Sequence, residues 1–241
     1  MTEPLEDVTA AILAGGLGTR LRSRIADRPK VLAPVHGRPY LAYLLEQLAE
    51  AGIPHVVLLT GYLGEQIRST FGETFAGLRL GYSFESSPLG TAGALRLALP
   101  QLLGSTILLL NGDSYCAAPL PEFVAMHRRQ SADFSLILTP VEDCSRYGRV
   151  CLEPDGRILR FKEKSQAGSA GWVNAGIYLI NRSLIEDISA DESASLERDM
   201  FPKWTVRRRC FGFHCRGPFL DIGTPESYAQ AEHFFTPPSV G

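Results

Sequence analysis

Short apolar runs of strand length recur through the first half of this chain and divide it into regular units. Each run holds four to six mainly apolar residues and is bounded by glycine, proline or polar residues, a pattern that predicts buried strands. The predicted strands span residues 8–13, 55–60, 80–84 and 106–110.

Between these strands, apolar residues return at the period of an α-helix. Pro39 suits the opening residue of a helix and Gly52 its end, with leucines 41, 44, 45 and 48 on one face. A further helix is predicted at 65–71, and another carries Leu95, Ala98, Leu99 and Leu102 on its inner face. Strands that alternate with helices predict a mostly parallel sheet covered on both faces, with ligands at the carboxyl ends of the strands.

The second half changes character and adds a hairpin. Residues 147–164 hold two short strand patterns around the turn Pro154-Asp155-Gly156. A strand at 173–180, a helix at 183–188 and a helix that starts at Thr224-Pro225 and runs to 235 follow. We expect one domain over 8–235, with tails at 1–7 and 236–241.

Composition narrows the class of protein. The 241 residues carry a formal net charge of −2, so no basic field favours a nucleic acid partner. Arg207-Arg208-Arg209 is interpreted as a solvated strand end. No apolar run reaches membrane-spanning length, and the first eight residues include acidic side chains where a secretory signal would be basic. The five cysteines are irregularly spaced and include no CxxC pair. We therefore expect a cytoplasmic protein without a membrane partner. The sequence leaves open whether the protein forms a homo-oligomer.

A glycine-rich loop follows the first strand. Gly15, Gly16 and Gly18 let backbone N–H groups close around phosphate oxygens, and the cations Arg20 and Lys30 stand at the exit of the loop. The spacing matches neither GxGxxG nor GxxxxGK[ST]. From the glycines alone, a tight turn in an α/β protein is as good an interpretation as a phosphate loop.

The loop and its flanks resemble the signature of the sugar-1-phosphate nucleotidylyltransferases. The resemblance covers residues 8–235 and is greatest to the D-glycero-α-D-manno-heptose 1-phosphate guanylyltransferases, with mannose-1-phosphate guanylyltransferases and glucose-1-phosphate thymidylyltransferases as alternatives. It is carried in order by LAGGLGTRL, RPKVLAPV, ESSPLGTAGAL, LNGDSY, RYGRV, FKEK, VNAGIY, SLERDMFP and FLDIGTPESY. It implies a single-domain, Rossmann-like three-layer α/β/α fold with a mostly parallel mixed sheet and a small β-hairpin subregion, of the nucleotide-diphospho-sugar transferase type.

Two aspartates stand where strands are predicted to end. Asp113 follows the strand at 106–110 and Asp221 precedes the last helix, so both carboxylates can reach the ligand-binding edge of the sheet. Taken alone, Asn111-Gly112-Asp113 is typical of a simple turn. Mg²⁺ needs only one or two protein carboxylates beside substrate phosphates, and the resemblance assigns Asp113 and Asp221 as its ligands.

Charged residues after the hairpin are candidates for the sugar phosphate. By resemblance, Glu163 binds sugar hydroxyls and Lys164 binds phosphates. Strand alternation puts these two side chains on opposite faces, however, so an exposed edge is the simpler interpretation of the charged run. Tyr147, Gly148 and Asn174 resemble further sugar-contacting positions.

The segment from Glu85 to Ala94 indicates which nucleotide base the protein binds. Guanine offers two adjacent N–H donors that one carboxylate can accept together, so Glu85 favours GTP over pyrimidine nucleotides. An exposed glutamate without a base contact is the alternative. The resemblance places nucleotide contacts at Leu13, Ala14, Gly15, Gly16, Gly18, Thr19, Glu85, Pro88, Gly90, Thr91 and Asp113.

Together these residues predict nucleotidyl transfer to a sugar 1-phosphate. The phosphate is a nucleophile at neutral pH, so no general base is needed. Catalysis is assigned to Mg²⁺ on Asp113 and Asp221, with Arg20 and Lys30 on the departing phosphates and Lys164 between the two reacting phosphates. The alternatives are a non-catalytic nucleotide-sugar sensor, which could lose these residues, and a metal-dependent glycosyltransferase, which usually offers two carboxylates one residue apart.

Overall fold

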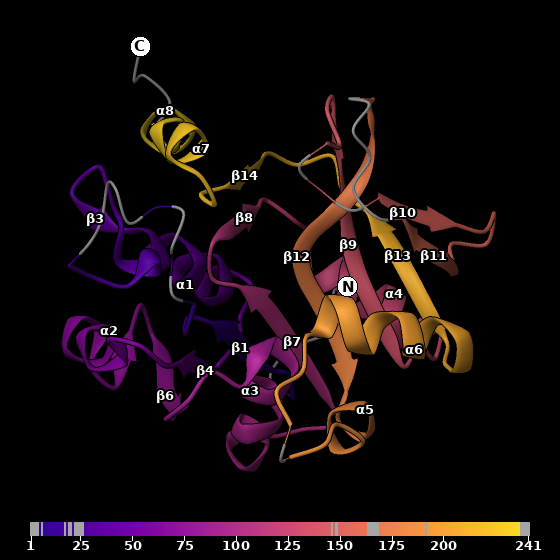
Figure 1. Cartoon of the computed structure of the whole chain (residues 1–241), viewed down its shortest axis with the longest axis horizontal. Helices are drawn as coiled ribbons and strands as arrows, with labels where there is room; N and C mark the ends of the chain where they lie inside the picture. Colours follow the sequence, from indigo (N-terminus) through magenta and orange to yellow (C-terminus); the bar gives the residue numbers. More distant parts are fainter. Residues whose placement is uncertain are drawn as a thin grey trace.

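The computed structural model describes residues 5, 7–16, 18, 21, 27–145, 147, 149–162, 169–190 and 192–236, with the backbone alone at 162. These residues form three layers, a large mixed sheet with helices on both faces (Figure 1). The three-layer α/β/α fold expected from the sequence is confirmed. No helix of the described residues is both long enough and apolar enough to cross a membrane.

Four parallel strands form one half of the sheet. In spatial order they are β7 (Thr106–Asn111), β1 (Thr9–Leu13), β4 (His55–Thr60) and β6 (Leu78–Phe84), and the short β5 (Thr74–Phe75) pairs antiparallel on the outer edge. All four long strands match the predicted ones within two residues. Their carboxyl ends therefore share one edge of the sheet.

The long strand β12 (Gly171–Asn181) begins the other half of the sheet and runs antiparallel to β7. It also pairs antiparallel with β9 and β10, while β10 and β11 make the predicted hairpin and β13 lies parallel to β9. The bounds are β9 (Phe134–Val141), β10 (Arg149–Leu152), β11 (Ile158–Lys162) and β13 (Cys210–His214). In this half of the sheet, only β9 and β13 had no counterpart among the predicted strands.

Alternate residues of the strands point to separate cores. On β1, Ala10 and Ile12 belong to one buried cluster and Ala11 to the other, as the period of a strand requires. One cluster includes residues of α1 (Tyr40–Glu50), α2 (Gly64–Phe71) and α4 (Leu120–Arg129). The other includes residues of α3 (Gly90–Ala98), α5 (Arg182–Glu186) and α6 (Phe201–Arg207). Figure 1 shows α6 crossing in front of the sheet and α4 behind it.

Two details of the sequence interpretation change. Helix α1 begins at Tyr40, because Pro39 pairs with Pro34 in a two-stranded bridge and serves as the residue before the helix. The arginine run 207–209 lies at the end of α6 and in the turn before β13, where all three residues are exposed. It is a solvated helix end, not a strand end.

A small antiparallel ladder lies above the carboxyl ends of the parallel strands. Its strands are β8 (Ser114–Cys116) and β14 (Phe219–Asp221), with Asp221 opposite Ser114. A capping box between Thr224 and Ser227 starts α7 (Pro225–Ala229), as the sequence predicted. The predicted single helix to 235 is divided into α7 and α8 (Ala231–Phe234).

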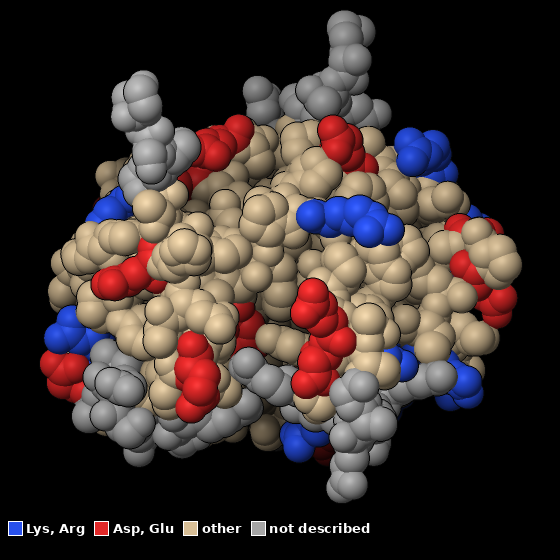
Figure 2. All heavy atoms as spheres, turned by 90° about the horizontal axis from the view of Figure 1, so that it is seen from above, with Lys and Arg blue, Asp and Glu red and all other residues tan. Residues whose placement is uncertain are grey.

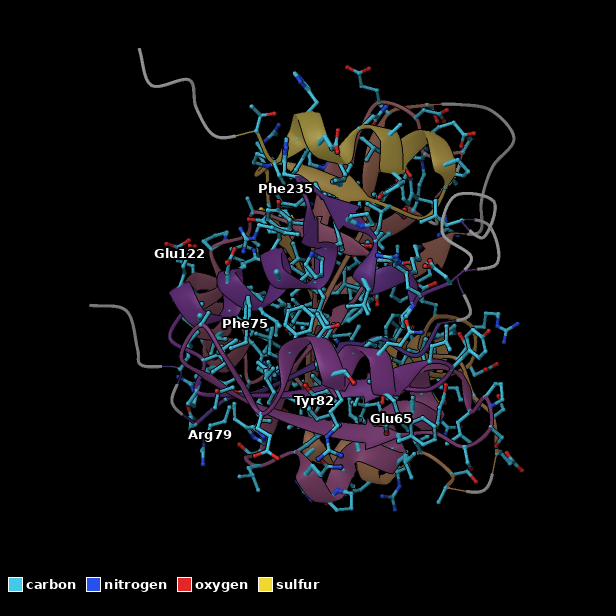
Figure 3. The ribbon with its side chains drawn as sticks, turned by 90° about the vertical axis from the view of Figure 1, so that its left-hand side faces the viewer. Glu65, Phe75, Arg79, Tyr82, Glu122 and Phe235 are labelled. Carbon is cyan, nitrogen blue, oxygen red and sulfur yellow. The ribbon has the colours of Figure 1, made fainter. Side chains whose placement is uncertain are left out.

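Aromatic packing fastens the C-terminal helices to the rest of the chain. The ring of Phe235 stacks on Tyr43 of α1 at 4.0 Å between centroids and meets Tyr115 of β8 edge-on at 5.0 Å. Figure 3 shows Phe235 beside the C-terminal helices, with Phe75, Arg79 and Tyr82 along the β5–β6 edge below it. The strand that follows Asp113 is therefore braced by a residue more than 110 positions away.

We predict that Gly112→Ala destabilises the fold. A Cβ at Gly112 would lie 2.3 Å from the carbonyl oxygen of Leu13, which accepts a hydrogen bond from the Gly112 N–H at 3.0 Å. The two strands would have to separate, at a cost of about 1–3 kcal/mol in the free energy of unfolding. Urea denaturation measures this cost. Gly16→Ala is the control, because no atom of the described residues beyond its chain neighbours lies within 4 Å of a Cβ there; equal stability of the two variants would contradict the prediction.

Candidate functional site

A cavity of about 730 Å³ opens at the carboxyl ends of the parallel strands. Its volume is in the range of small-molecule and cofactor sites. Figure 2 looks onto this edge of the molecule and shows a hollow near its centre, with acidic residues beside it. The predicted residues that line the cavity are Leu13, Ala14, Gly15, Gly16, Lys30, Glu85, Pro88, Gly90, Thr91 and Asp113.

The glycine loop forms one wall. The Ala14 N–H donates to the Leu59 carbonyl at 2.8 Å, so the loop stays attached to β4 as it leaves β1. Gly16 faces open space, and Gly18 adopts a φ of +58°, a conformation that favours glycine. Thr19 and Arg20 lie outside the described residues.

Lys30 and Asp113 meet at the end of the cavity. The Lys30 Nζ lies 2.7 Å from Oδ2 of Asp113, although 83 residues separate them along the chain. The Lys30 side chain is largely buried at 13% exposure, while the Asp113 side chain is 40% exposed. A cation and a carboxylate that share one end of a cavity provide opposite charges for a phosphate and for a metal ion.

The structure brings the two predicted metal aspartates together. The carbonyl of Asp113 accepts a hydrogen bond from the Ile222 N–H at 2.9 Å, and Asp221 pairs with Ser114 across the β8–β14 ladder. Burial raises the pKa of the Tyr40 phenol well above its usual value, and the charges of Asp113 and Asp221 raise it further, so both carboxylates act on the same ring. Asp221 also accepts a hydrogen bond from the Gly223 N–H.

These two carboxylates fit a hard divalent cation. They are oxygen donors on neighbouring segments, Asp113 just before β8 and Asp221 at the end of β14, and Asp113 reaches the cavity. Within the part of the chain that the structure describes, no cluster of three or more metal-binding side chains occurs. The donor set therefore suits an ion that completes its coordination with water and substrate oxygens, as Mg²⁺ does.

Glu85 has a second role besides lining the cavity. Its Oε2 accepts a hydrogen bond from the Leu89 N–H at 3.0 Å. Its Oε1 fills the space that a Cβ would take at Gly15 and Gly61, 3.0 Å and 2.9 Å from the ideal positions. The carboxylate therefore closes the loop after β6 onto the start of α3, and it packs against the glycines of the loops after β1 and β4.

Gly90 and Thr91 lie in the cavity wall and also contact protein backbone. Gly90 has a φ of +72°, and a Cβ there would lie 2.4 Å from the Ala194 carbonyl oxygen. The Thr91 hydroxyl oxygen accepts a hydrogen bond from the Leu196 N–H at 2.8 Å. The start of α3 thus holds the segment 192–197 against the cavity.

Three further polar side chains, which the sequence did not single out as site residues, line the cavity. Asn111, Tyr178 and Glu197 line it, and the Asn174 amide donates to the Tyr178 phenol at 2.8 Å and to Oε1 of Glu197 at 3.1 Å. Burial, and then the charge of Glu197, raise the pKa of Tyr178 well above its usual value. The phenol therefore stays protonated and acts as a hydrogen-bonding group.

The remaining predicted sugar residues are placed only in part. Asn174 lies behind the cavity wall and acts on it through Tyr178 and Glu197. Tyr147 contacts the ring of Phe219 in β14 at 6.0 Å between centroids. Gly148, Glu163 and Lys164 lie outside the described residues. Alternation along β12 could have predicted Tyr178 as inward-facing, but nothing local to Glu197 marked it.

Comparison with known proteins agrees with this arrangement. The nucleotidyl transferase family model matches residues 9–237. The chain belongs to this family. The expectation that the protein is an enzyme of the nucleotidyltransferase class is thereby confirmed.

Curated relatives of this nucleotidyltransferase include enzymes that act on sugar phosphates. It is 37% identical over 223 residues to the D-glycero-alpha-D-manno-heptose 1-phosphate guanylyltransferase of Aneurinibacillus thermoaerophilus, covering 92% of this chain and 96% of the relative. It is 35% identical to the mannose-1-phosphate guanylyltransferase of Mycobacterium tuberculosis, covering 92% of this chain but only 63% of that protein.

Solved structures show the same fold. HddC from Yersinia pseudotuberculosis, solved alone and with GMP-PN, has 31% identity and a TM-score of 0.85, covering 95% of this chain and 99% of that chain. A putative glucose-1-phosphate thymidylyltransferase from Bacillus anthracis, in complex with a sucrose, has a TM-score of 0.84 at 22% identity, covering 97% of each chain. That second likeness concerns the fold alone.

Proposed function

We propose that this nucleotidyltransferase transfers GMP from GTP to a sugar 1-phosphate, D-glycero-α-D-manno-heptose 1-phosphate foremost, and releases pyrophosphate. The observation that carries the proposal is the meeting of Lys30 and Asp113 at the end of a glycine-walled cavity, with Asp221 on the adjoining strand. The relative that is 37% identical over nearly its whole length supports the choice of sugar.

The chemistry requires positioning more than proton transfer. A sugar 1-phosphate is largely dianionic at neutral pH, by analogy with phosphorylated side chains, and its oxygen attacks the α-phosphorus of GTP in line. The bond between the α-phosphorus and the oxygen that bridges to the β-phosphate breaks, and the departing pyrophosphate keeps that oxygen and the electron pair. Lys30 neutralises charge that develops on the phosphates, and we assign the same kind of role to Arg20 and Lys164.

Mg²⁺ fits the two aspartates and would be held by Asp113 and Asp221. Bound there, it would neutralise phosphate charge and fix the orientation of the triphosphate. The chain's own contribution is the β8–β14 ladder, which sets the spacing of the two carboxylates, and the Lys30 ammonium, which offsets the charge of Asp113.

Guanine fits the wall formed by Glu85 and its neighbours. A glutamate carboxylate can accept from the ring N–H and the exocyclic amine of guanine while one of its oxygens also accepts from Leu89, because each oxygen has two lone pairs. Tyr62 and Phe84, which are 52% and 55% exposed, line the same cavity and offer aromatic faces to a purine. The structure of the relative with GMP-PN supports a guanine nucleotide.

The substrate pair is tested by measuring pyrophosphate release from a matrix of nucleoside triphosphates and sugar 1-phosphates. We expect the largest kcat/KM for GTP with the heptose 1-phosphate, and mannose 1-phosphate is the main competitor. Turnover of no combination would remove the proposal and favour a non-catalytic sensor.

We predict that Asp113→Asn nearly abolishes Mg²⁺-dependent pyrophosphate release while the protein stays folded. The amide removes the negative charge that a divalent cation needs, and it weakens the charge-assisted bond to Lys30. Circular dichroism checks that the variant is folded, and a Mg²⁺ titration of pyrophosphate release measures the loss of activity. Asp187→Asn is the matched control, because Asp187 is exposed and pairs with Arg208 on α6's end. Near-normal turnover of Asp113→Asn would reject the metal assignment.

We predict that Glu85→Gln lowers kcat/KM for GTP by roughly tenfold or more relative to TTP and UTP. The glutamine oxygen can still accept from the Leu89 N–H, so the loops keep their arrangement, but the charge-assisted pair with guanine is lost. Steady-state kinetics with the three triphosphates measure the ranking. An unaltered ranking would show that Glu85 serves only its own loop, through the bond to Leu89.

A further inference from the structure

We infer that Thr91 is a positioning residue for the sugar side of the site, although it lies in the wall expected to bind the nucleotide. It anchors the segment 192–197, here called the strap, which carries Glu197 to the cavity. This inference rests on the proposed function, because it concerns how the second substrate is held.

Three hydrogen bonds join the strap to the start of α3. The Ala194 N–H donates to the Leu89 carbonyl and the Ala92 N–H donates to the Ala194 carbonyl, both at 2.9 Å. The Leu196 N–H donates to the Thr91 hydroxyl oxygen at 2.8 Å. Two of these bonds are between backbone groups, so Thr91 supplies the only side-chain anchor among the three. Figure 1 shows the chain between α5 and α6 passing α3.

The sequence around Gly90 permits this close approach. With a φ of +72°, Gly90 lets the Ala194 carbonyl oxygen come to 2.4 Å from the position of a Cβ, which no other residue would allow. Gly90 therefore makes room for the strap, and Thr91 accepts a hydrogen bond from it. A nucleotide need not be present for either task.

The strap ends in a stiff turn that aims Glu197. The Ser195 N–H donates to Oδ2 of Asp199 at 2.7 Å, and the Arg198 N–H donates to the Ser195 hydroxyl at 3.3 Å. These bonds start the helix Leu196–Met200, and Glu197 is its second residue. The direction of the Glu197 side chain thus follows from where Leu196 is held.

Glu197 joins the polar cluster on the sugar side. Its Oε1 accepts from the Asn174 amide at 3.1 Å, and the same amide donates to the Tyr178 phenol. A carboxylate and a neutral phenol at one cavity wall, both bonded to an amide behind it, are groups that bind sugar hydroxyls through hydrogen bonds. A strap that loosens at Leu196 misplaces this acceptor, while the glycine loop and Glu85 keep their own contacts.

The test is Thr91→Val, which keeps the shape of threonine and removes the acceptor. We expect KM for the sugar 1-phosphate to rise by about five- to tenfold, the size of one lost hydrogen bond, with KM for GTP changed less than twofold. Thr91→Ser restores the acceptor and the normal KM. Glu197→Gln raises the KM of the sugar 1-phosphate in the same way. Thr70→Val is the control, because Thr70 is exposed and its hydroxyl donates to the Gln66 carbonyl within α2.

Hydrogen–deuterium exchange of the peptide over 192–200 provides a readout that does not depend on turnover. We expect faster exchange in Thr91→Val than in wild type, Thr91→Ser or Thr70→Val. Unchanged exchange, or a KM for GTP that rises as much as that for the sugar, overturns the inference. If wild type turns over no substrate pair, the proposed function fails, and the exchange result still decides whether Thr91 anchors the strap.

Discussion

The site depends on one close approach between two parallel strands. Where β1 and β7 end, the Gly112 N–H donates to the Leu13 carbonyl at 3.0 Å, and no side chain stands between the two backbones. The glycine loop leaves immediately after Leu13, and Asp113 follows immediately after Gly112. One backbone hydrogen bond therefore sets the glycine loop and the Asp113 carboxylate side by side. Lys30 then closes the arrangement through its ion pair with Asp113.

The two halves of the sheet have different tasks. The parallel strands end at one edge and leave their loops free to surround a nucleotide. The antiparallel strand β12 crosses this edge beside β7, and its register shifts between Asn174 and Tyr178. That irregularity, with Gly176 at a φ of +79°, turns Tyr178 and Asn174 toward Glu197. The cavity thus lies where a regular half of the sheet meets an irregular one.

Several residues serve the fold and the site together. Glu85 lines the cavity and also closes the loop after β6, and Thr91 lines the cavity and also holds the strap. Tyr115 of β8 packs against Phe235, so the C-terminal helices brace the strand next to Asp113. A change in activity at such a position has to be separated from a change in geometry. Variants that keep the hydrogen-bond acceptor, such as Thr91→Ser, make that separation.

The sequence determined the parallel half of the fold and the glycine loop, because apolar runs and glycines report local backbone preferences directly. It also indicated Asp113 and Asp221, since both follow strand patterns and match a family signature over most of the chain. The strands β9 and β13 escaped prediction, and they pair with each other across some seventy residues. Their pairing partners are not visible in a local pattern.

Only the tertiary structure decided which of the candidate groups act on one another. The contact of Lys30 with Asp113 spans 83 residues, and that of Asn174 with Glu197 depends on a strap held by Thr91. The residue types and their spacing in the sequence indicate which chemistry each side chain can perform. Distances between segments far apart in the chain arise from sheet order and core packing, which depend on all the elements at once.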